Sequence, residues 1–218
     1  MDVRRGAERW LGLLGVAAAC VYFLHVAVGQ AAYPGYRWME QAVSDLTAVD
    51  APSYGVASRL SAVYGALACQ ASTAVALLAR SEEGRTYRLG FYLYAWMNAA
   101  SFVGYTLFPL SSGGFAGALQ DLMHAYVVTA AVVLLSLGSL GCLIAGGIGR
   151  PERRPMVIAA SLALGSMTVG SIGMGALPPA WFGLMERFSV FSVVLFTAFL
   201  GVFGFVAVGR PVGPPRAG

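Results

Sequence analysis

The feature that most constrains this chain is the distribution of its charged residues, which are nearly absent from six long apolar stretches. Only 11% of the 218 residues are charged and 58% are hydrophobic, whereas charged residues make up about 25% of an average soluble protein. A soluble domain of this length has too small an interior to bury so much apolar surface. We therefore expect an integral membrane protein.

Each apolar stretch is long enough to cross a bilayer as a helix, because a span needs roughly 20 mostly apolar residues. The loops between the stretches are too short to fold independently, so we predict one integral membrane domain over residues 1–218. The expected fold class is an all-α membrane protein, a bundle of six transmembrane helices. The expected spans are residues 10–30, 53–79, 89–111, 122–148, 156–177 and 188–209.

The arginines predict the orientation, because positively charged residues near span ends are retained in the cytoplasm. Six spans place both termini on one face of the membrane. That face would carry eleven of the fourteen arginines, and the opposite, outer face would carry Arg37, Arg59 and Arg187. We therefore expect a multi-pass cell membrane protein with cytoplasmic N- and C-termini. The net charge of +4 is then a topogenic signal, and no nucleic-acid partner is expected.

The N-terminus has a second interpretation, because Arg4 and Arg5 followed by an apolar run also describe a signal peptide with a small-residue cleavage site before Ala32. The apolar run is longer than a usual signal core. Its removal would leave five spans and place the termini on opposite sides of the membrane. We expect the first span to be retained.

Small residues recur at helical spacing within the spans. In the second span they are Ala57, Ser61, Gly65, Cys69 and Thr73. Such stripes let helices approach one another closely. We expect a tight bundle, with homo-oligomerisation through small-residue faces as a further possibility. The three cysteines lie within spans without paired spacing, so we interpret them as packing residues.

Polar side chains return at the outer side of the membrane. Both histidines, His25 and His124, lie about one helical turn inside the outer boundary of their spans. Residues 36–46, in the long first outer loop, are predicted to form a short interfacial helix with Tyr36 and Trp38 as aromatic anchors. The other polar candidates on this side are Glu40, Ser44, Asp45, Arg59, Asp121, Glu186 and Arg187.

Arg59 lies inside the second span, where a charged side chain must either extend to the interface or pair with a carboxylate. By depth, the nearest carboxylates are Asp45, Asp121 and Glu186. Both alternatives remain open.

Asp121 and His124 are three residues apart at the start of the fourth span, so they are expected to share a helix face. Asp121 either caps this helix or orients the imidazole of His124 for proton transfer or metal ligation. Glu186 has the same capping interpretation at the start of the sixth span.

Several short motifs on the outer side resemble a known family. They are Ser44-Asp45-Leu46, Leu107-Phe108-Pro109, His124 and Glu186-Arg187-Phe188. With these motifs the chain resembles, over nearly its whole length, the six-span prokaryotic membrane proteins grouped as domain of unknown function 998. The resemblance implies a helical six-span fold and one outward-facing site containing Ser44, Asp45, His124, Glu186 and Arg187. It implies no particular reaction.

Three classes of function remain. The first is a binding, sensing or assembly role for a polar, outward-facing pocket, with membrane lipids as partners. The second is an intramembrane hydrolase acting on a lipid or lipid-linked substrate at the outer leaflet. The third is a small-solute transporter, although the spans lack midplane charges and matching broken helices. The binding candidates are His25, Glu40, Asp45, Arg59, Asp121 and Arg187, and the catalytic candidates are Ser44, Asp45, His124 and Glu186.

A metal-dependent hydrolase would need ligands that this chain supplies sparsely. His25, His124 and Asp121 or Asp45 are the candidate zinc ligands, with Glu40 or Glu186 as the base. Two histidines without a paired-histidine motif are a thin ligand set. A haem held between His25 and His124 is the less favoured alternative.

Overall fold

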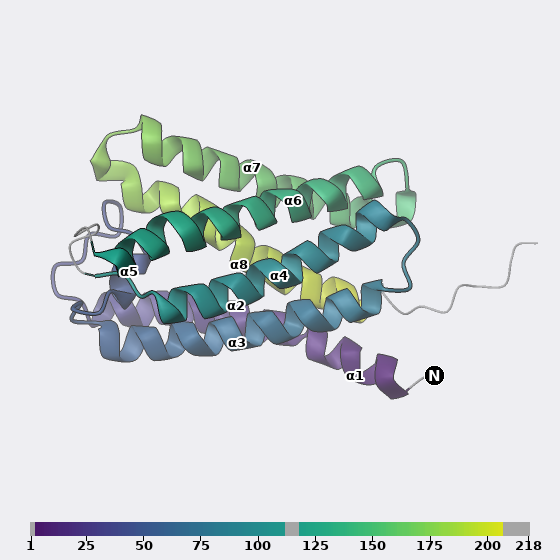
Figure 1. The fold of residues 1–218 in the computed structure, drawn as a ribbon, viewed down its shortest axis with the longest axis horizontal. Helices are drawn as coiled ribbons and strands as arrows, with labels where there is room; N and C mark the ends of the chain where they lie inside the picture. Colours follow the sequence, from purple (N-terminus) through teal and green to yellow (C-terminus); the bar gives the residue numbers. More distant parts are fainter. Residues whose placement is uncertain (1–2, 112–117, 207–218) are drawn as a thin grey trace, which may run out of the picture.

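The computed structural model describes residues 3–111 and 118–206, and it is a bundle of long helices (Figure 1). The long helices are α1 (Val3–Gly12), α2 (Leu14–Ala31), α3 (Tyr54–Ala79), α4 (Arg85–Leu107), α6 (Thr129–Gly147), α7 (Arg154–Ala176) and α8 (Phe182–Val206). The short elements are η1 (Ser44–Thr47), α5 (Leu119–Leu122), η2 (Met123–Val128), η3 (Pro151–Arg153) and η4 (Pro179–Trp181). The element η2 is a π-helix, and the other three η elements are 3-10 helices.

The long helices pack as a closed ring. Going around it, α2 contacts α3, α3 contacts α4, α4 contacts α6, α6 contacts α7, α7 contacts α8, and α8 returns to α2. Tyr94 of α4 crosses the interior and donates a hydrogen bond to the Val193 carbonyl of α8. Its ring packs against Phe196, 5.1 Å between centroids. The ring therefore encloses an aromatic core rather than a water-filled pore.

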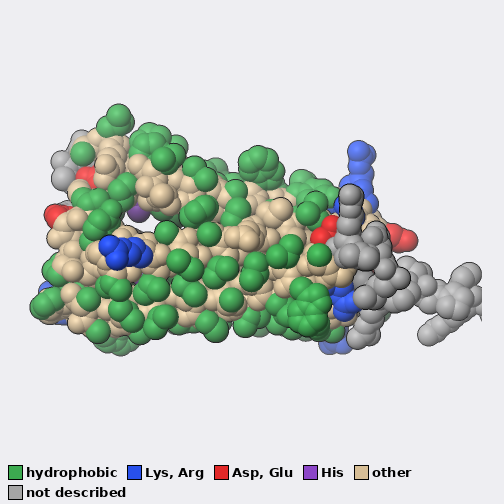
Figure 2. All heavy atoms as spheres, turned by 90° about the horizontal axis from the view of Figure 1, so that it is seen from below, with side chains coloured by type: hydrophobic (Ala, Val, Ile, Leu, Met, Phe, Trp, Pro, Cys, Tyr) green, Lys and Arg blue, Asp and Glu red, His purple; other side chains and the backbone are tan. Residues whose placement is uncertain are grey.

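The outer surface has the polarity expected of a membrane protein. Hydrophobic side chains cover the flank seen in Figure 2, and charged side chains lie mostly toward its two ends. Five helical segments are long and apolar enough to cross a bilayer: Gly6–Ala31, Tyr54–Ala79, Leu119–Gly147, Pro151–Ala176 and Pro179–Val206. The chain is a helical membrane-spanning protein.

The sixth expected span corresponds to α4, which is not among these five segments. With 23 residues it is about 35 Å long at 1.5 Å per residue, so its length suffices to span a membrane. Its composition is less apolar, because it begins with two arginines and carries several tyrosines and Asn98. Neighbours on both sides, α3 and α6, shield it.

The two ends of the bundle carry different loops. Residues 32–53, residues 108–111 after α4 and the connection from α7 to α8 lie at one end, here called the loop end. Both ends of the described chain lie at the other, here called the terminal end (Figure 1). Both ends of the described chain therefore lie at the same end of the bundle.

At the terminal end, Arg153 attaches neighbouring loops to the bundle. Its Nη1 donates to the Gly146 carbonyl, and its Nη2 donates to Glu82 Oε2 at 3.2 Å and to the Glu83 carbonyl. The guanidinium also lies 4.0 Å from the ring centroid of Tyr87. We call these contacts the Arg153 clamp.

Small residues lie at close helix contacts at some positions of the bundle but not at others. A Cβ on Gly65 would lie 2.5 Å from the ring of Phe102 in α4, so this position of the second-span stripe is a contact point. In contrast, a Cβ on Gly165 in α7 would meet nothing within 4 Å. That glycine does not mark a helix interface within the described residues.

Two local expectations differ from the structure. Residues 36–43 form turns instead of a helix, and the only helical turn in this part of the loop is the 3-10 helix Ser44–Thr47. The last helix begins at Phe182, six residues before the expected boundary at residue 188, because Pro179 starts a 3-10 turn that leads directly into it. Glu186 and Arg187 consequently lie within α8 and do not precede it.

Candidate ligand-binding site

Arg187 is the centre of the polar site at the loop end. Its Nη1 donates to the carbonyls of Trp38, Gln41 and Gly183, at 2.6, 3.1 and 2.7 Å. Its Nη2 donates to the hydroxyl of Tyr36 at 2.8 Å. The side chain is only 5% exposed. One guanidinium therefore connects α8 to the middle of the long loop.

Glu186, the preceding residue, binds the next part of the same loop. Its Oε2 accepts a hydrogen bond from the backbone N–H of Val43, and its Oε1 accepts one from the hydroxyl of Ser44 at 3.4 Å. The arginine thus binds loop carbonyls, while the glutamate binds loop donors. We call these contacts, together with those of Arg187, the Arg187 clamp.

Tyr36 and Asp45 stabilise the loop from within. The Tyr36 hydroxyl donates to the carbonyls of Ala42 and Gln41, at 2.7 and 3.1 Å. Burial raises the pKa of Tyr36 to about 12, although Arg187 opposes the shift by its charge and hydrogen bond. The phenol therefore stays protonated at neutral pH.

Asp45 accepts a hydrogen bond from the Ala42 N–H at 3.0 Å. Burial raises the pKa of Asp45 above its ordinary value of 3.8, while the Ala42 N–H and the charge of Arg187 act in the opposite direction.

Gly183 makes the close approach of loop and helix possible. A Cβ at this position would lie 2.6 Å from the Trp38 carbonyl oxygen and closer still to that of Gln41. The backbone N–H of Leu184 donates to the Met39 carbonyl at 3.0 Å. Glycine is therefore required here by contact with backbone atoms, which cannot move aside as a flexible side chain can.

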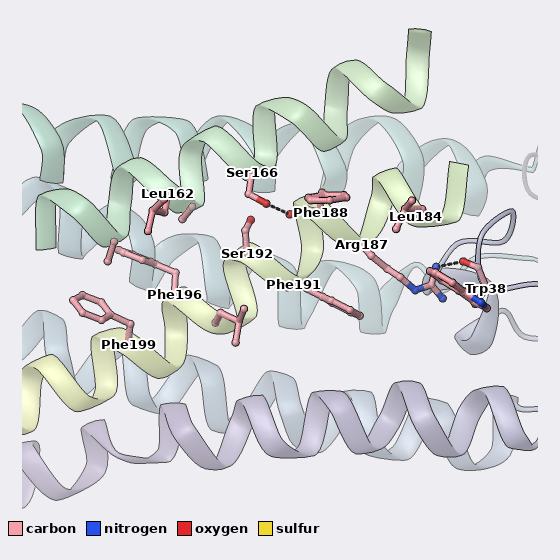
Figure 3. A pocket seen from close by; sticks show the side chains of 13 residues that line it. Trp38, Leu162, Ser166, Leu184, Arg187, Phe188, Phe191, Ser192, Phe196 and Phe199 are labelled. Carbon is pink, nitrogen blue, oxygen red and sulfur yellow. Dashed lines mark hydrogen bonds between the residues drawn. The ribbon is translucent and has the colours of Figure 1, made fainter. Parts of the chain in front are cut away.

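A cavity of about 660 Å³ begins beside the Arg187 clamp and runs along the surface between α7 and α8 (Figure 3). Arg187 and Trp38 lie together at one end of the pocket, and Phe199 lies toward the other. Its walls are mostly apolar. Leu162 and Leu195, which line it, are 70% and 56% exposed, so the cavity opens on the hydrophobic flank of the bundle.

A second cavity, of about 420 Å³, lies between α2 and α8. Its lining includes Phe23, Ala27 and Gln30 of α2. Three residues line both cavities: Trp38, Arg187 and Phe191. The two cavities therefore adjoin at the residue that clamps the loop.

A separate polar cluster joins the α4–α5 connection to the π-helix. Asp121 is fully buried and accepts hydrogen bonds from the N–H and the hydroxyl of Ser111, at 3.0 and 2.6 Å. The Nδ1 of His124 lies 2.7 Å from the Phe108 carbonyl, and its ring packs on Tyr105. Asp121 lies in the first turn of α5, where a negative charge is favoured, although its side chain makes no capping hydrogen bond there.

His25 is joined to neither cluster by a hydrogen bond within the described residues. It is 2% exposed, and its two buried ring nitrogens have no hydrogen-bond partner among the described residues. Its ring packs on Tyr22. Helix α2, which carries His25, packs against α3 and α8, whereas the π-helix that carries His124 packs against α4 and α6.

The remaining candidates, Glu40 and Arg59, lie outside these clusters. Glu40 forms a salt bridge with the neighbouring Arg37 at 2.8 Å on the surface of the loop. Arg59 is exposed and forms no salt bridge within residues 3–111 and 118–206. The carboxylates expected to pair with it accept hydrogen bonds elsewhere.

The expected metal ligands are likewise not brought together. Among the residues that the structure describes, no group of three or more His, Cys, Asp or Glu side chains could hold a metal ion. Both carboxylate oxygens of Asp121 accept hydrogen bonds from Ser111, while His25 lies among apolar and aromatic side chains.

The family comparison matches residues 16–203 to the model described as "Protein of unknown function (DUF998)". The chain belongs to this family. The DUF998 match extends from α2 into α8 and includes both cavities and the Arg187 clamp. The comparison with curated proteins found no match, and neither did the comparison with solved structures.

The sequence of this DUF998 chain indicated Trp38 and Arg187, but our predictions missed Gly183 and the apolar residues that line the cavities. Phe191, Leu195 and Phe199 recur at helical spacing on one face of α8, which is a usable signal. This spacing is hard to recognise in the sequence, because the other faces of α8 are also apolar.

Proposed function

We propose that this DUF998 protein binds a membrane lipid at the loop end, with a hydrocarbon chain in the α7–α8 cavity and the headgroup beside the Arg187 clamp. The observation that carries the proposal is the cavity itself. It is apolar along its length, opens on the bilayer-facing flank, and has a guanidinium and an indole at one end. Its volume of about 660 Å³ falls within the usual range for small-molecule sites.

The length of the cavity supports a lipid chain as the occupant. From Arg187 to Phe199 the helix rises about 18 Å, at 1.5 Å per residue. One leaflet of a bilayer contributes about 15 Å of hydrocarbon. A chain that starts at Arg187 would therefore extend to about the bilayer midplane.

Trp38 supports the placement of the headgroup. Tryptophan is favoured at the boundary between hydrocarbon and headgroups, because its ring is apolar and its N–H is polar. Trp38 is 47% exposed and lies at the end of the cavity beside Arg187. In our proposal this end lies at the outer leaflet of the cell membrane, and the arginine distribution supports that orientation.

The polar contacts favour binding over hydrolysis. Ser44, Asp45 and Glu186 all bind groups of the loop or of one another, so they stabilise a conformation. A serine nucleophile would need a neighbouring base that is itself oriented by a third group. In the described residues both histidines lie in other surroundings.

The proposal is tested by filling the cavity. Leu162→Trp would place an indole in it, while Ile172→Trp makes a comparable change on α7 at an exposed position that does not line it. In native mass spectrometry of the detergent-solubilised protein with dipalmitoyl phosphatidylglycerol, Leu162→Trp should lower the affinity about tenfold, or about 1.4 kcal/mol.

The Ile172→Trp protein should bind the lipid as the unsubstituted protein does. Equal affinity of the Leu162→Trp protein and the unsubstituted protein would overturn the proposal. Thermal unfolding of both variants shows whether either substitution has altered the fold instead.

A further inference from the structure

We infer that the ligand of this site is a two-chain phospholipid, whose chains lie in the two cavities on either side of Phe191 and whose phosphate lies at Arg187. The inference rests on the proposed lipid-binding function and specifies its ligand class. It starts from the observation that Trp38, Arg187 and Phe191 line both cavities.

The arrangement of the cavities fits two chains that diverge from one point. One cavity follows α8 on the side of α7, and the other follows it on the side of α2. Both have Phe191 in their lining, one turn further along α8 than Arg187. The chains of a phospholipid likewise diverge from a single glycerol next to the phosphate.

The second cavity is shorter than the first. From Gln30 to Phe23 the helix rises about 10 Å, at 1.5 Å per residue. It would hold the first part of a second chain, with the remainder in the bilayer. Gln30 also brings a side-chain amide to the loop end of this cavity, where the ester groups of a lipid would lie.

Arg187 has hydrogen-bonding capacity left for a phosphate. A guanidinium carries five N–H donors. The clamp uses both donors of Nη1 and one donor of Nη2, while Nε donates no hydrogen bond within the described residues. Arginine binds phosphate strongly through such paired donors.

The charge of Arg187 also favours an anionic group. The guanidinium is buried, and among the described residues no carboxylate lies within salt-bridge distance of it, although Asp45 and Glu186 are close enough to interact with its charge. Buried charges usually have a partner of opposite sign. A phosphate at the junction of the cavities would supply it.

The test compares two palmitoyl lipids in native mass spectrometry, dipalmitoyl phosphatidylglycerol and its single-chain lyso form. The unsubstituted protein should bind the two-chain lipid about tenfold more tightly. Ala27→Trp, which fills only the second cavity, should remove this preference. Ala17→Trp, at an exposed position of α2 that lines neither cavity, should retain it.

A third lipid tests the phosphate. Dipalmitoylglycerol has the same two chains without a phosphate and should bind about tenfold more weakly than the phospholipid, because charge-assisted hydrogen bonds are lost. Equal affinities for these two lipids would overturn the assignment of phosphate to Arg187.

Retention of the chain preference in the Ala27→Trp protein would overturn the two-chain assignment. If Leu162→Trp still weakens binding in that case, the lipid-binding function stands and only the ligand class is wrong. If Leu162→Trp has no effect either, the proposed function fails as well.

Discussion

Two buried arginines hold loops at opposite ends of the bundle, and they do so with similar contacts. Arg187 at the loop end is 5% exposed and Arg153 at the terminal end is 4% exposed. Each donates hydrogen bonds to loop carbonyls, and each lies near aromatic rings. Loop attachment alone therefore accounts for a buried arginine in this fold.

The similarity extends to a glycine beside each arginine. Arg187 binds the carbonyl of Gly183, and Arg153 binds that of Gly146. A Cβ on Gly183 would collide with loop carbonyls, and a Cβ on Gly146 would lie 2.6 Å from the backbone nitrogen of Tyr87. Both clamps therefore form where two backbones meet with no side chain between them.

The two arginines differ in their carboxylate partners and in the cavities beside them. Arg153 has a carboxylate partner, Glu82, at 3.2 Å, whereas Arg187 has none within the described residues and borders two cavities. The charge of Arg153 is thus paired within the protein and needs no ligand. Of the two, only Arg187 lacks a carboxylate within salt-bridge distance among the described residues and also borders cavities.

The largest expected effect comes from Gly183→Ala, which tests whether the Arg187 clamp depends on backbone contact. The added Cβ would force the loop carbonyls of Trp38 and Gln41 away from α8. We expect a loss of about 3 kcal/mol of stability, at the upper end of overpacking effects. Thermal unfolding in detergent measures it.

The matched control is Gly165→Ala, in α7, where the new Cβ meets nothing within 4 Å. Alanine is favoured over glycine in a helix by up to about 1 kcal/mol, so this variant should be as stable as the unsubstituted protein or more so. Equal unfolding temperatures for the two variants would contradict the close-contact argument.

The second prediction separates the two arginines by function. Arg153→Met removes three hydrogen bonds, one of them to Glu82, and should cost about 2 kcal/mol, as expected for bonds to a charged group. It should leave lipid affinity unchanged in native mass spectrometry. Arg187→Met should lower both stability and lipid affinity, and equal lipid affinity in the two variants would remove the distinction.

The third prediction concerns pH at the loop end. Burial raises the pKa of Asp45 above 3.8, so the folded state holds this proton more tightly than the unfolded state. Its contribution to the free energy of unfolding therefore falls as pH rises from 3.8 through the raised pKa. Asp45→Asn should remove this pH dependence. Unfolding profiles of both proteins that stay parallel over this range would refute it.

The smallest effect is expected for Arg59→Gln. Arg59 is exposed and lies in neither clamp, and surface substitutions away from special contacts usually change stability by less than about 0.5 kcal/mol. Thermal unfolding and lipid affinity should both stay unchanged. A loss comparable to that of Arg153→Met would reveal a partner that the described residues do not include.

The helices themselves were predictable, because hydrophobicity along the chain and the charged interruptions determine where helices of bilayer length form. Their rotation about their own axes was not. Leu162 in α7 is apolar and 70% exposed, while Leu200 in α8 is apolar and 2% exposed. Since lipid and protein interior favour the same side chains, composition does not distinguish the outward face from the inward face.

Four residues of the site were predictable, but their contacts were not. Ser44, Asp45, Glu186 and Arg187 lie together as the family resemblance implied, but Arg187 binds carbonyls and Glu186 binds an N–H. Every residue type carries backbone carbonyl and N–H groups, so the sequence does not indicate which of them a side chain will bind. The resemblance also placed His124 in this site, and its Nδ1 lies 2.7 Å from the Phe108 carbonyl.

The π-helix Met123–Val128 has a consequence for chain length. A π-turn contains one residue more than an α-turn. The helical segments before and after it, α5 and α6, therefore present the same faces to their neighbours as they would without the additional residue. Deleting Val127, which is 53% exposed, would leave a continuous α-helix from Leu119 to Gly147. Asp121 would still face Ser111, and only the contacts within the π-turn, such as that of His124 with Phe108, would change. We therefore expect this segment to tolerate the loss of one residue better than the regular helices do.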